Sequence, residues 1–335
     1  MYYRPIPSSD GFFFTRNEID NEQVQKMVYS SVAAFVASGV TCAIYHPLDC
    51  LRVRWQLIPK NSPVVSSGFL RFGINIVSKE GLFQGLWKPG LHSNVTGMAL
   101  SASIRFGCYE IIRDSLAMID SRERPQGIKS NMNHKSAFQM CVAGILCGAL
   151  GYGTATPFHL LKTLQQSQRA YIYQHQLYSS LNLEMSHITR TISIQNIINT
   201  SGLSHLWRGC IPVSCRGALF TSGQMLGYDG LKTFGKEHLH LQDGVILHVN
   251  SSIAASFGAS VLSAPADLMM TKHMSNSGPK AATLWSNVKE IFIQDGVIGF
   301  WRGWSIYFAR LTPVMLTYST LYEETRNNFG IGYLS

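Results

Sequence analysis

The charged side chains with the clearest spacing lie in three short strings that each begin with a proline. An acid or a histidine stands two residues after the proline, and a cation or a methionine stands five residues after it. Side chains three apart lie on one face of a helix, where they can pair with opposite charges on neighbouring helices. The chemistry predicted here is ion pairing and not covalent catalysis. The strings are Pro47-Leu-Asp49-Cys-Leu-Arg52, Pro157-Phe-His159-Leu-Leu-Lys162 and Pro265-Ala-Asp267-Leu-Met-Met270.

Two further patterns accompany each string. One is an aromatic, a cation and a glycine, with a proline inserted in the first copy; the other is a tyrosine, an acid, two spacers and a cation. Recurrence at a period of roughly 110 residues indicates an internal repeat, so we expect one body of three fused units. The copies are Trp87-Lys88-Pro89-Gly90, Trp207-Arg208-Gly209 and Trp301-Arg302-Gly303, then Tyr109-Glu110-Ile-Ile-Arg113, Tyr228-Asp229-Gly-Leu-Lys232 and Tyr322-Glu323-Glu-Thr-Arg326.

Six long apolar stretches, two per repeat, must position these patterns. Hydrophobic residues make up 46% of the 335-residue chain and charged residues 14%, yet the mean hydropathy is only +0.06. This combination is typical of helices that cross a membrane around a watery interior, and each string's proline predicts a kink in its helix. The stretches are about 27–56, 90–115, 138–166, 209–233, 247–273 and 304–327.

Composition argues against several other classes of protein. The net charge of +9 comes from Lys and Arg residues that stand singly, which favours an anionic solute or lipid over nucleic acid. The seven cysteines include no Cys-x-x-Cys pair, so we expect isolated thiols and neither a metal site nor a disulfide framework. We expect no cofactor. Residues 1–26 contain four acids and lack the acid-poor character of a transit peptide.

From residue 27 to about 330, these motifs resemble the mitochondrial carrier family. The resemblance implies an all-α membrane protein with six transmembrane helices in three tandem repeats, threefold pseudosymmetry, and short matrix helices between the helices of each repeat. We expect an N-terminal extension at 1–26 and repeats at 27–125, 135–240 and 247–330. The resemblance further implies a multi-pass protein of the mitochondrial inner membrane that is not an enzyme and is a monomer unless a larger assembly recruits it.

The proline strings resemble the family's matrix gate, where acids and cations of neighbouring odd-numbered helices pair. The resemblance pairs Asp49 with Lys162 and Asp267 with Arg52, and it places Gln56 and Gln166 as braces. His159 and Met270 occupy the third pair, which has lost both charges. Losing one charge would strand its partner, whereas losing both keeps the ring balanced. Two interpretations stay open: a working gate with two bridges, which we favour, and a degenerate relative that no longer transports.

The tyrosine patterns resemble the family's cytoplasmic gate, and all three copies are complete. A single pair of this kind would be an ordinary exposed contact, but the threefold recurrence favours a ring. The resemblance lets Glu110, Asp229 and Glu323 meet Lys232, Arg326 and Arg113, with Tyr109, Tyr228 and Tyr322 beneath them.

The aromatic-cation-glycine patterns resemble the family's cardiolipin sites. Free N–H groups at helix starts bind phosphate, and Trp favours the membrane interface. The residues expected at these sites are Gly81, Trp87, Lys88, Gly202, Trp207, Arg208, Gly209, Gly296, Trp301, Arg302 and Gly303.

A solute must bind between the gates, on the inner faces of the even-numbered helices. Arg216 and Arg310 fall on the family's contact positions and indicate an anion, because guanidinium binds carboxylate bidentately. For Arg105 a structural role stays open beside substrate contact. The strings around Asp267 and Arg216 are similar to those of oxaloacetate/sulfate-type dicarboxylate carriers. The expected substrate residues are Arg216, Arg310, Gly97, Met98, Arg105 and Gln224.

These features predict a carrier that moves a small dicarboxylate or oxoacid by alternating access. The altered third proline string keeps one alternative open, a carrier-like structural or adaptor subunit that does not transport. A proton-leak or nucleotide carrier is less favoured, because Arg216-Gly217 replaces the small apolar pair expected for adenine recognition.

Overall fold

Long helices dominate the fold. The computed structural model describes residues 16–57, 68–123, 137–177, 192–237, 245–275 and 283–329, and these contain helices and turns but no strand. Five of the six expected spans are single helices, and the third is split in two. They are α1 (Arg16–Leu57), α4 (Leu91–Glu123), α5 (Ala137–Thr154) with α6 (Thr156–Leu177), α8 (Cys210–Glu237), α9 (Val245–Ser275) and α11 (Trp304–Asn328).

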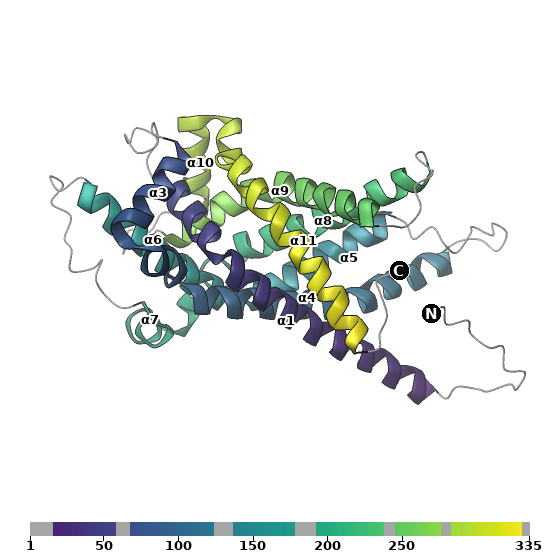
Figure 1. Cartoon of the computed structure of the whole chain (residues 1–335). Coiled ribbons are helices and arrows are strands. Elements are labelled where there is room, and N and C mark those ends of the chain that lie inside the picture. Colours follow the sequence, from purple (N-terminus) through teal and green to yellow (C-terminus); the bar gives the residue numbers. More distant parts are fainter. Residues whose placement is uncertain are drawn as a thin grey trace, which may run out of the picture.

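The long helices form a closed ring. Each one packs against its neighbours along the chain, in the order α1, α4, α5, α8, α9 and α11, and α11 returns to pack against α1. Together with the three sequence repeats, this ring is the six-helix carrier fold that the sequence predicts. Figure 1 shows α1, α4 and α11 side by side along the bundle.

Short helices connect the two long helices of each repeat. They gather at one end of the bundle, while the start of α1 and the end of α11 lie at the other end (Figure 1). The connecting helices are α3 (Phe69–Glu80) with η1 (Phe83–Trp87), α7 (Ile194–Ser201) with η2 (Leu203–Trp207), and α10 (Leu284–Asp295) with η3 (Val297–Trp301). η2 and η3 are 3₁₀-helices, whereas η1 is a π-helix. η1 belongs to the first repeat, the one whose aromatic-cation-glycine pattern has an extra residue.

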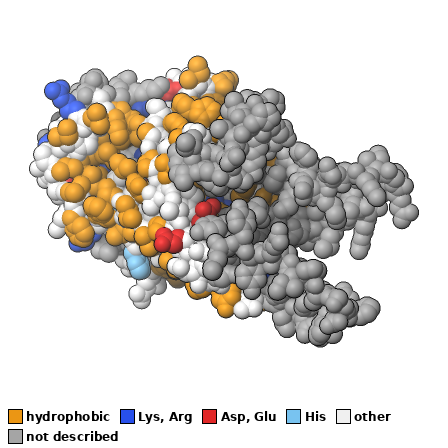
Figure 2. Space-filling view, turned by 45° about the vertical axis from the view of Figure 1, so that its right-hand side comes forward, with side chains coloured by type: hydrophobic (Ala, Val, Ile, Leu, Met, Phe, Trp, Pro, Cys, Tyr) orange, Lys and Arg blue, Asp and Glu red, His pale blue; other side chains and the backbone are white. Residues whose placement is uncertain are grey.

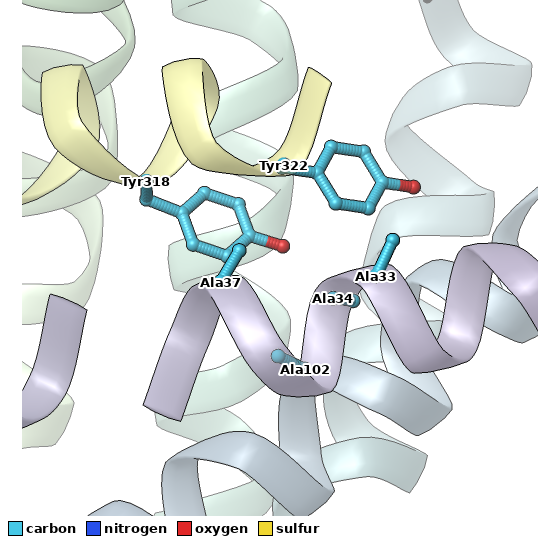
Figure 3. Packing of buried hydrophobic residues seen from close by; sticks show 6 residues of the cluster. All are labelled: Ala33, Ala34, Ala37, Ala102, Tyr318 and Tyr322. Carbon is cyan, nitrogen blue, oxygen red and sulfur yellow. The ribbon is translucent and has the colours of Figure 1, made fainter. Parts of the chain in front are cut away.

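The outside of α1 is apolar and its inside is small or polar, as expected in lipid. Val28, Val32, Val40 and Ile44 are each more than two-fifths exposed, because they share the outer face of the helix. The inner face carries alanines that pack with Ala102 of α4 and with Tyr318 and Tyr322 of α11 (Figure 3). Uncharged and hydrophobic side chains likewise cover most of the described surface in Figure 2. By length and composition, Val24–Leu57 and Asn250–Ser275 can each cross a membrane, and the bent pair α5–α6 makes a third candidate span.

Glycines let three helices approach closely. A side chain at Gly217 of α8 would lie 2.5 Å from the Gly148 carbonyl oxygen of α5, and one at Gly223 would lie 2.6 Å from the Gly258 carbonyl of α9. Small residues are favoured at such crossings in membranes because helix association there depends on close van der Waals contact.

The three string prolines act differently on their helices. Pro47 and Pro265 lie inside continuous helices, α1 and α9. The helix that precedes Pro157 ends at Thr154, and the two halves meet at 64°. The second repeat therefore bends at a break between two helices.

Candidate solute-binding site and gate

Six charged side chains from five helices meet inside the bundle. We call them the ion cluster: Asp49, Arg52, Lys162, Arg216, Asp267 and Arg310. Asp49 of α1 pairs with Lys162 of α6, and Asp267 of α9 pairs with Arg52 of α1. Both ion pairs that the sequence assigned to the matrix gate are therefore formed in this structure, and they tie three odd-numbered spans together.

The two expected substrate arginines belong to the same cluster. Arg216 Nε of α8 lies 2.8 Å from Asp267 Oδ1, and Arg310 Nη1 of α11 lies 2.8 Å from Asp49 Oδ1. Each gate carboxylate is thus shared between a cation of an odd-numbered span and an arginine of an even-numbered helix. Both expected bridges are formed, and these arginines add two further ion pairs to the same carboxylates.

The third gate position is aromatic and apolar. His159 is buried and stacks on Tyr152, with ring centroids 5.3 Å apart and planes 24° apart. Met270 is buried in the cluster that includes Tyr152, Leu160 and Met274. Packing has therefore replaced the missing ion pair, and Met is suited to this because its flexible thioether fills irregular space beside aromatic rings.

Hydrogen bonds brace the two carboxylates unequally. Gln56 Nε2 donates to Asp267 Oδ2 at 3.4 Å, as expected. Gln166 is buried and has no hydrogen bond to any residue within the described ranges. Asn94 of α4, which the sequence analysis did not identify, donates from Nδ2 to Asp49 Oδ2 at 3.3 Å and to His46 Nδ1 at 2.9 Å.

This bond to His46 explains the extra residue of the first repeat. Because His46 Nδ1 accepts from Asn94, the ring carries its proton on Nε2, which then donates to the Pro89 carbonyl at 3.0 Å. Pro89 is the inserted residue, so the insertion supplies the acceptor that orients His46 beside the gate. The insertion of Pro89 was visible in the sequence, but its hydrogen-bond partner His46 was not.

Two buried tyrosines lie between the arginines. The Arg52 guanidinium carbon is 4.0 Å from the ring centroid of Tyr307, and that of Arg310 is 5.7 Å from it. Tyr152 has Arg216 at 5.1 Å and Arg105 at 5.8 Å. These contacts hold the guanidinium groups in place through cation–π attraction. Tyr152 was missed because it belongs to none of the repeated patterns.

The other expected substrate residues occupy different surroundings. Gly97 lies where α4 crosses α6, and a side chain there would come 2.9 Å from Phe158 Cβ. Met98 packs against the Tyr152–Met270 cluster. Gln224 Nε2 faces Met315 Sδ at 3.6 Å. Arg105 is buried and donates to Thr221 Oγ1 at 3.4 Å.

The cytoplasmic gate lies mostly outside the described side chains. The side chains of Glu110, Arg113, Tyr228, Asp229 and Lys232 are not described. Of the remaining members, Arg326 Nη1 donates to Tyr322 Oη at 3.2 Å, Glu323 is half-buried, and Tyr109 packs against Ala143 and Cys147. The ring of ion pairs expected there stays a prediction.

Two tryptophans of the expected lipid sites have a structural role. Trp87 Nε1 donates to the Ala43 carbonyl at 2.9 Å, and Trp301 Nε1 donates to the Val261 carbonyl at 3.0 Å. These carbonyls stand four residues before Pro47 and Pro265, so each has lost its helical N–H partner to the proline ring. The indole N–H replaces that partner.

The glycines that end the preceding short helices are helix caps. Gly81, Gly202 and Gly296 have positive φ angles, and their N–H groups donate to carbonyls at the ends of α3, α7 and α10. The backbone N–H groups of these glycines are therefore already engaged in hydrogen bonds within the protein. Partial burial lowers the pKa of His205, and the Arg208 guanidinium lowers it further. The lowered pKa favours a neutral imidazole, so Arg208 is the main positive charge at the expected lipid site of the second repeat. No group of three potential metal ligands occurs within the described ranges.

Comparison with known proteins agrees with this geometry. A "Probable mitochondrial 2-oxoglutarate/malate carrier protein" of Dictyostelium discoideum is 28% identical over 87% of this chain and 85% of that protein. The "Mitochondrial citrate transporter F" of Aspergillus niger is 27% identical over 86% of each chain. The "Mitochondrial uncoupling protein 4" of Arabidopsis thaliana is 25% identical over 88% of this chain and 97% of that protein.

The three sequence repeats decide the family. The family model for "Mitochondrial carrier protein" matches residues 23–119, 133–239 and 242–332, which leaves only short segments outside it. Members of this family are transporters and not enzymes. The chain therefore belongs to the mitochondrial carrier family and is a multi-pass solute carrier of the mitochondrial inner membrane.

Proposed function

We propose that this carrier moves a small dicarboxylate or oxoacid dianion by alternating access. One observation carries the proposal: the ion cluster holds four cations, Arg52, Lys162, Arg216 and Arg310, but only two carboxylates. Charges inside a membrane protein are costly unless they are paired. A solute with two negative charges would balance the cluster.

The arrangement also suggests how binding would open the gate. Arg216 and Arg310 are on even-numbered helices, while their partners Asp267 and Asp49 are on odd-numbered ones. A solute carboxylate that binds Arg216 would compete with Asp267 for it, and so would weaken the contact of α8 with α9. The solute stabilises the open state only as far as it binds that state better.

Names of relatives support this class of solute in part. The names of two relatives refer to 2-oxoglutarate/malate and to citrate, which are all small polycarboxylates. The name of the uncoupling protein refers to no solute. Charge in the buried cluster is therefore the stronger argument.

Transport into liposomes tests the proposal. Reconstituted protein should take up dicarboxylates and oxoacids in preference to amino acids and nucleotides, and Arg216→Ala or Arg310→Ala should remove that uptake. Arg71→Ala, on the exposed face of α3, is the matched control and should behave as the parent. Uptake that persists in both cluster variants would refute the assignment. A folded parent that moves no solute of the panel would favour the adaptor alternative.

We also propose that cardiolipin binds beside Arg208 and Arg302. The support is that these cations follow η2 and η3 and precede long helices, where amide groups favour phosphate. Because a ligand of the folded state raises apparent stability, cardiolipin should raise the melting temperature of protein in detergent. Arg208→Ala and Arg302→Ala should each reduce that increase while Arg71→Ala should not. An equal increase in all variants would contradict the proposal.

A further inference from the structure

Tyr152 is the meeting point of three polar side chains from three other helices. Arg105 of α4 and Arg216 of α8 lie over its ring, and His159 of α6 stacks on it. Tyr152 itself is almost fully buried. The two guanidinium carbons lie 5.8 and 5.1 Å from the same ring centroid, so both arginines contact one side chain.

Arg105 is a buried cation without a described counter-ion. Its exposed fraction is 6%, and in the described part of the chain no carboxylate pairs with it and no acceptor faces its Nε. Its contacts include a 3.4 Å hydrogen bond to Thr221 and the rings of Phe106, Phe220 and Tyr152, at 4.9, 5.5 and 5.8 Å. Aromatic faces attract the cation but cannot accept all five of its N–H donors in hydrogen-bond geometry.

His159 supplies a second unsatisfied polar group at the same place. Its exposed fraction is 1%, and its Nε2 has no hydrogen-bond partner among the residues that the structure describes. A buried polar atom without a partner destabilises the fold, and such exceptions call for an explanation. A carboxylate placed beside Tyr152 would satisfy both Arg105 and the imidazole N–H.

We propose that Arg105 and His159, with Tyr152 between them and Arg216, form a second anion subsite for the far carboxylate of the solute. This inference rests on the proposed function, because it needs the near carboxylate to bind Arg216. The carbon body would cross the Tyr152 ring beside Met98 and Met270, which pack in the same cluster. The chain would then select dicarboxylates over monocarboxylates of the same length, and His159 would be a specificity residue instead of a lost gate acid.

A matched pair of ligands tests this subsite. Glutarate has a carboxylate at each end, whereas its monoamide, glutaramate, has a neutral amide in place of the second carboxylate. The parent protein should bind glutarate about tenfold more tightly or better, as measured by the ligand's stabilisation of purified protein in detergent. Arg105→Gln and His159→Leu should each bring the two dissociation constants close together by weakening glutarate and leaving glutaramate unchanged. Arg71→Gln, the same change at an exposed position, should keep the full preference.

The conservative variant Arg105→Lys guards against a simple loss of folding. It retains the charge, so it should keep part of the preference where Arg105→Gln loses it. A parent that binds neither ligand would refute the proposed function itself. A parent with the preference, and an Arg105→Gln variant that keeps it, would overturn the subsite alone.

Discussion

The second repeat handles its proline differently from the first and third. In those two repeats a tryptophan indole donates to the carbonyl that the proline leaves without a partner, and the helix continues. In the second repeat the corresponding carbonyl is that of Gly153. It accepts from Thr156 Oγ1 at 2.7 Å and faces Cys210 Sγ at 3.9 Å, and the helix is broken there. Local side chains can therefore satisfy the same orphan group with or without a continuous helix.

The repeats also differ in the charge of the residue that stands two positions after the proline. Asp49 pairs with Lys162 and Arg310 and has Arg52 at 3.8 Å, and Asp267 pairs with Arg52 and Arg216. His159 instead stacks on an aromatic ring. A buried ion pair must offset the desolvation of two charges, whereas a neutral imidazole stacked on an aromatic ring must offset only the desolvation of its ring nitrogens. At the positions expected to form the matrix gate, packing therefore holds the third pair together while charge holds the other two.

The largest expected effect is the loss of a shared carboxylate. Asp267→Asn removes the counter-ion of Arg216 and leaves Arg52 with the more distant Asp49, at 3.8 Å, so it should destabilise the protein by about 3–5 kcal/mol. His159→Gln removes no ion pair and should cost about 1–2 kcal/mol. Unfolding midpoints in detergent measure both. A larger cost for His159→Gln would show that packing, and not charge, dominates the gate.

A charge pair introduced between the second and third repeats should have an intermediate effect. His159→Asp alone would lose the stacking contact with Tyr152 and bury a carboxylate whose expected partner position holds an uncharged methionine, so we expect it to destabilise the fold. Met270→Lys added to it should recover part of the loss, with a coupling of about 1–3 kcal/mol in a double-mutant cycle. Additive effects of the two changes would mean that these positions do not face each other in the ring.

The smallest effect concerns the indole hydrogen bonds. Trp301→Phe and Trp87→Phe keep an aromatic ring but leave the Val261 or Ala43 carbonyl unpaired, which should cost about 1 kcal/mol each. Trp207→Phe is the internal control, because no indole hydrogen bond of Trp207 occurs among the described residues. It should change stability by only a few tenths of a kcal/mol. Equal effects at all three positions would contradict the proline-capping role.

Much of the fold could be predicted from the repeated strings. Three copies of three patterns predicted the number of repeats and the six spans, because each pattern marks the same point of the same supersecondary unit. The pairs Asp49–Lys162 and Asp267–Arg52 came from the resemblance of these patterns to the carrier family. The replacement of the third pair by His159 and Met270 was also visible, because the other copies of the pattern have an acid and a cation at these positions.

The tertiary structure decided which groups share the ion cluster. Arg216 and Arg310 are far in sequence from Asp267 and Asp49, and no spacing rule joins an even helix to the gate of an odd one. Tyr152, Asn94 and His46 contribute through contacts across helices, and those depend on how closely glycines let the helices approach. A sequence pattern records what repeats within each unit, whereas the ion cluster is formed where three non-identical units meet.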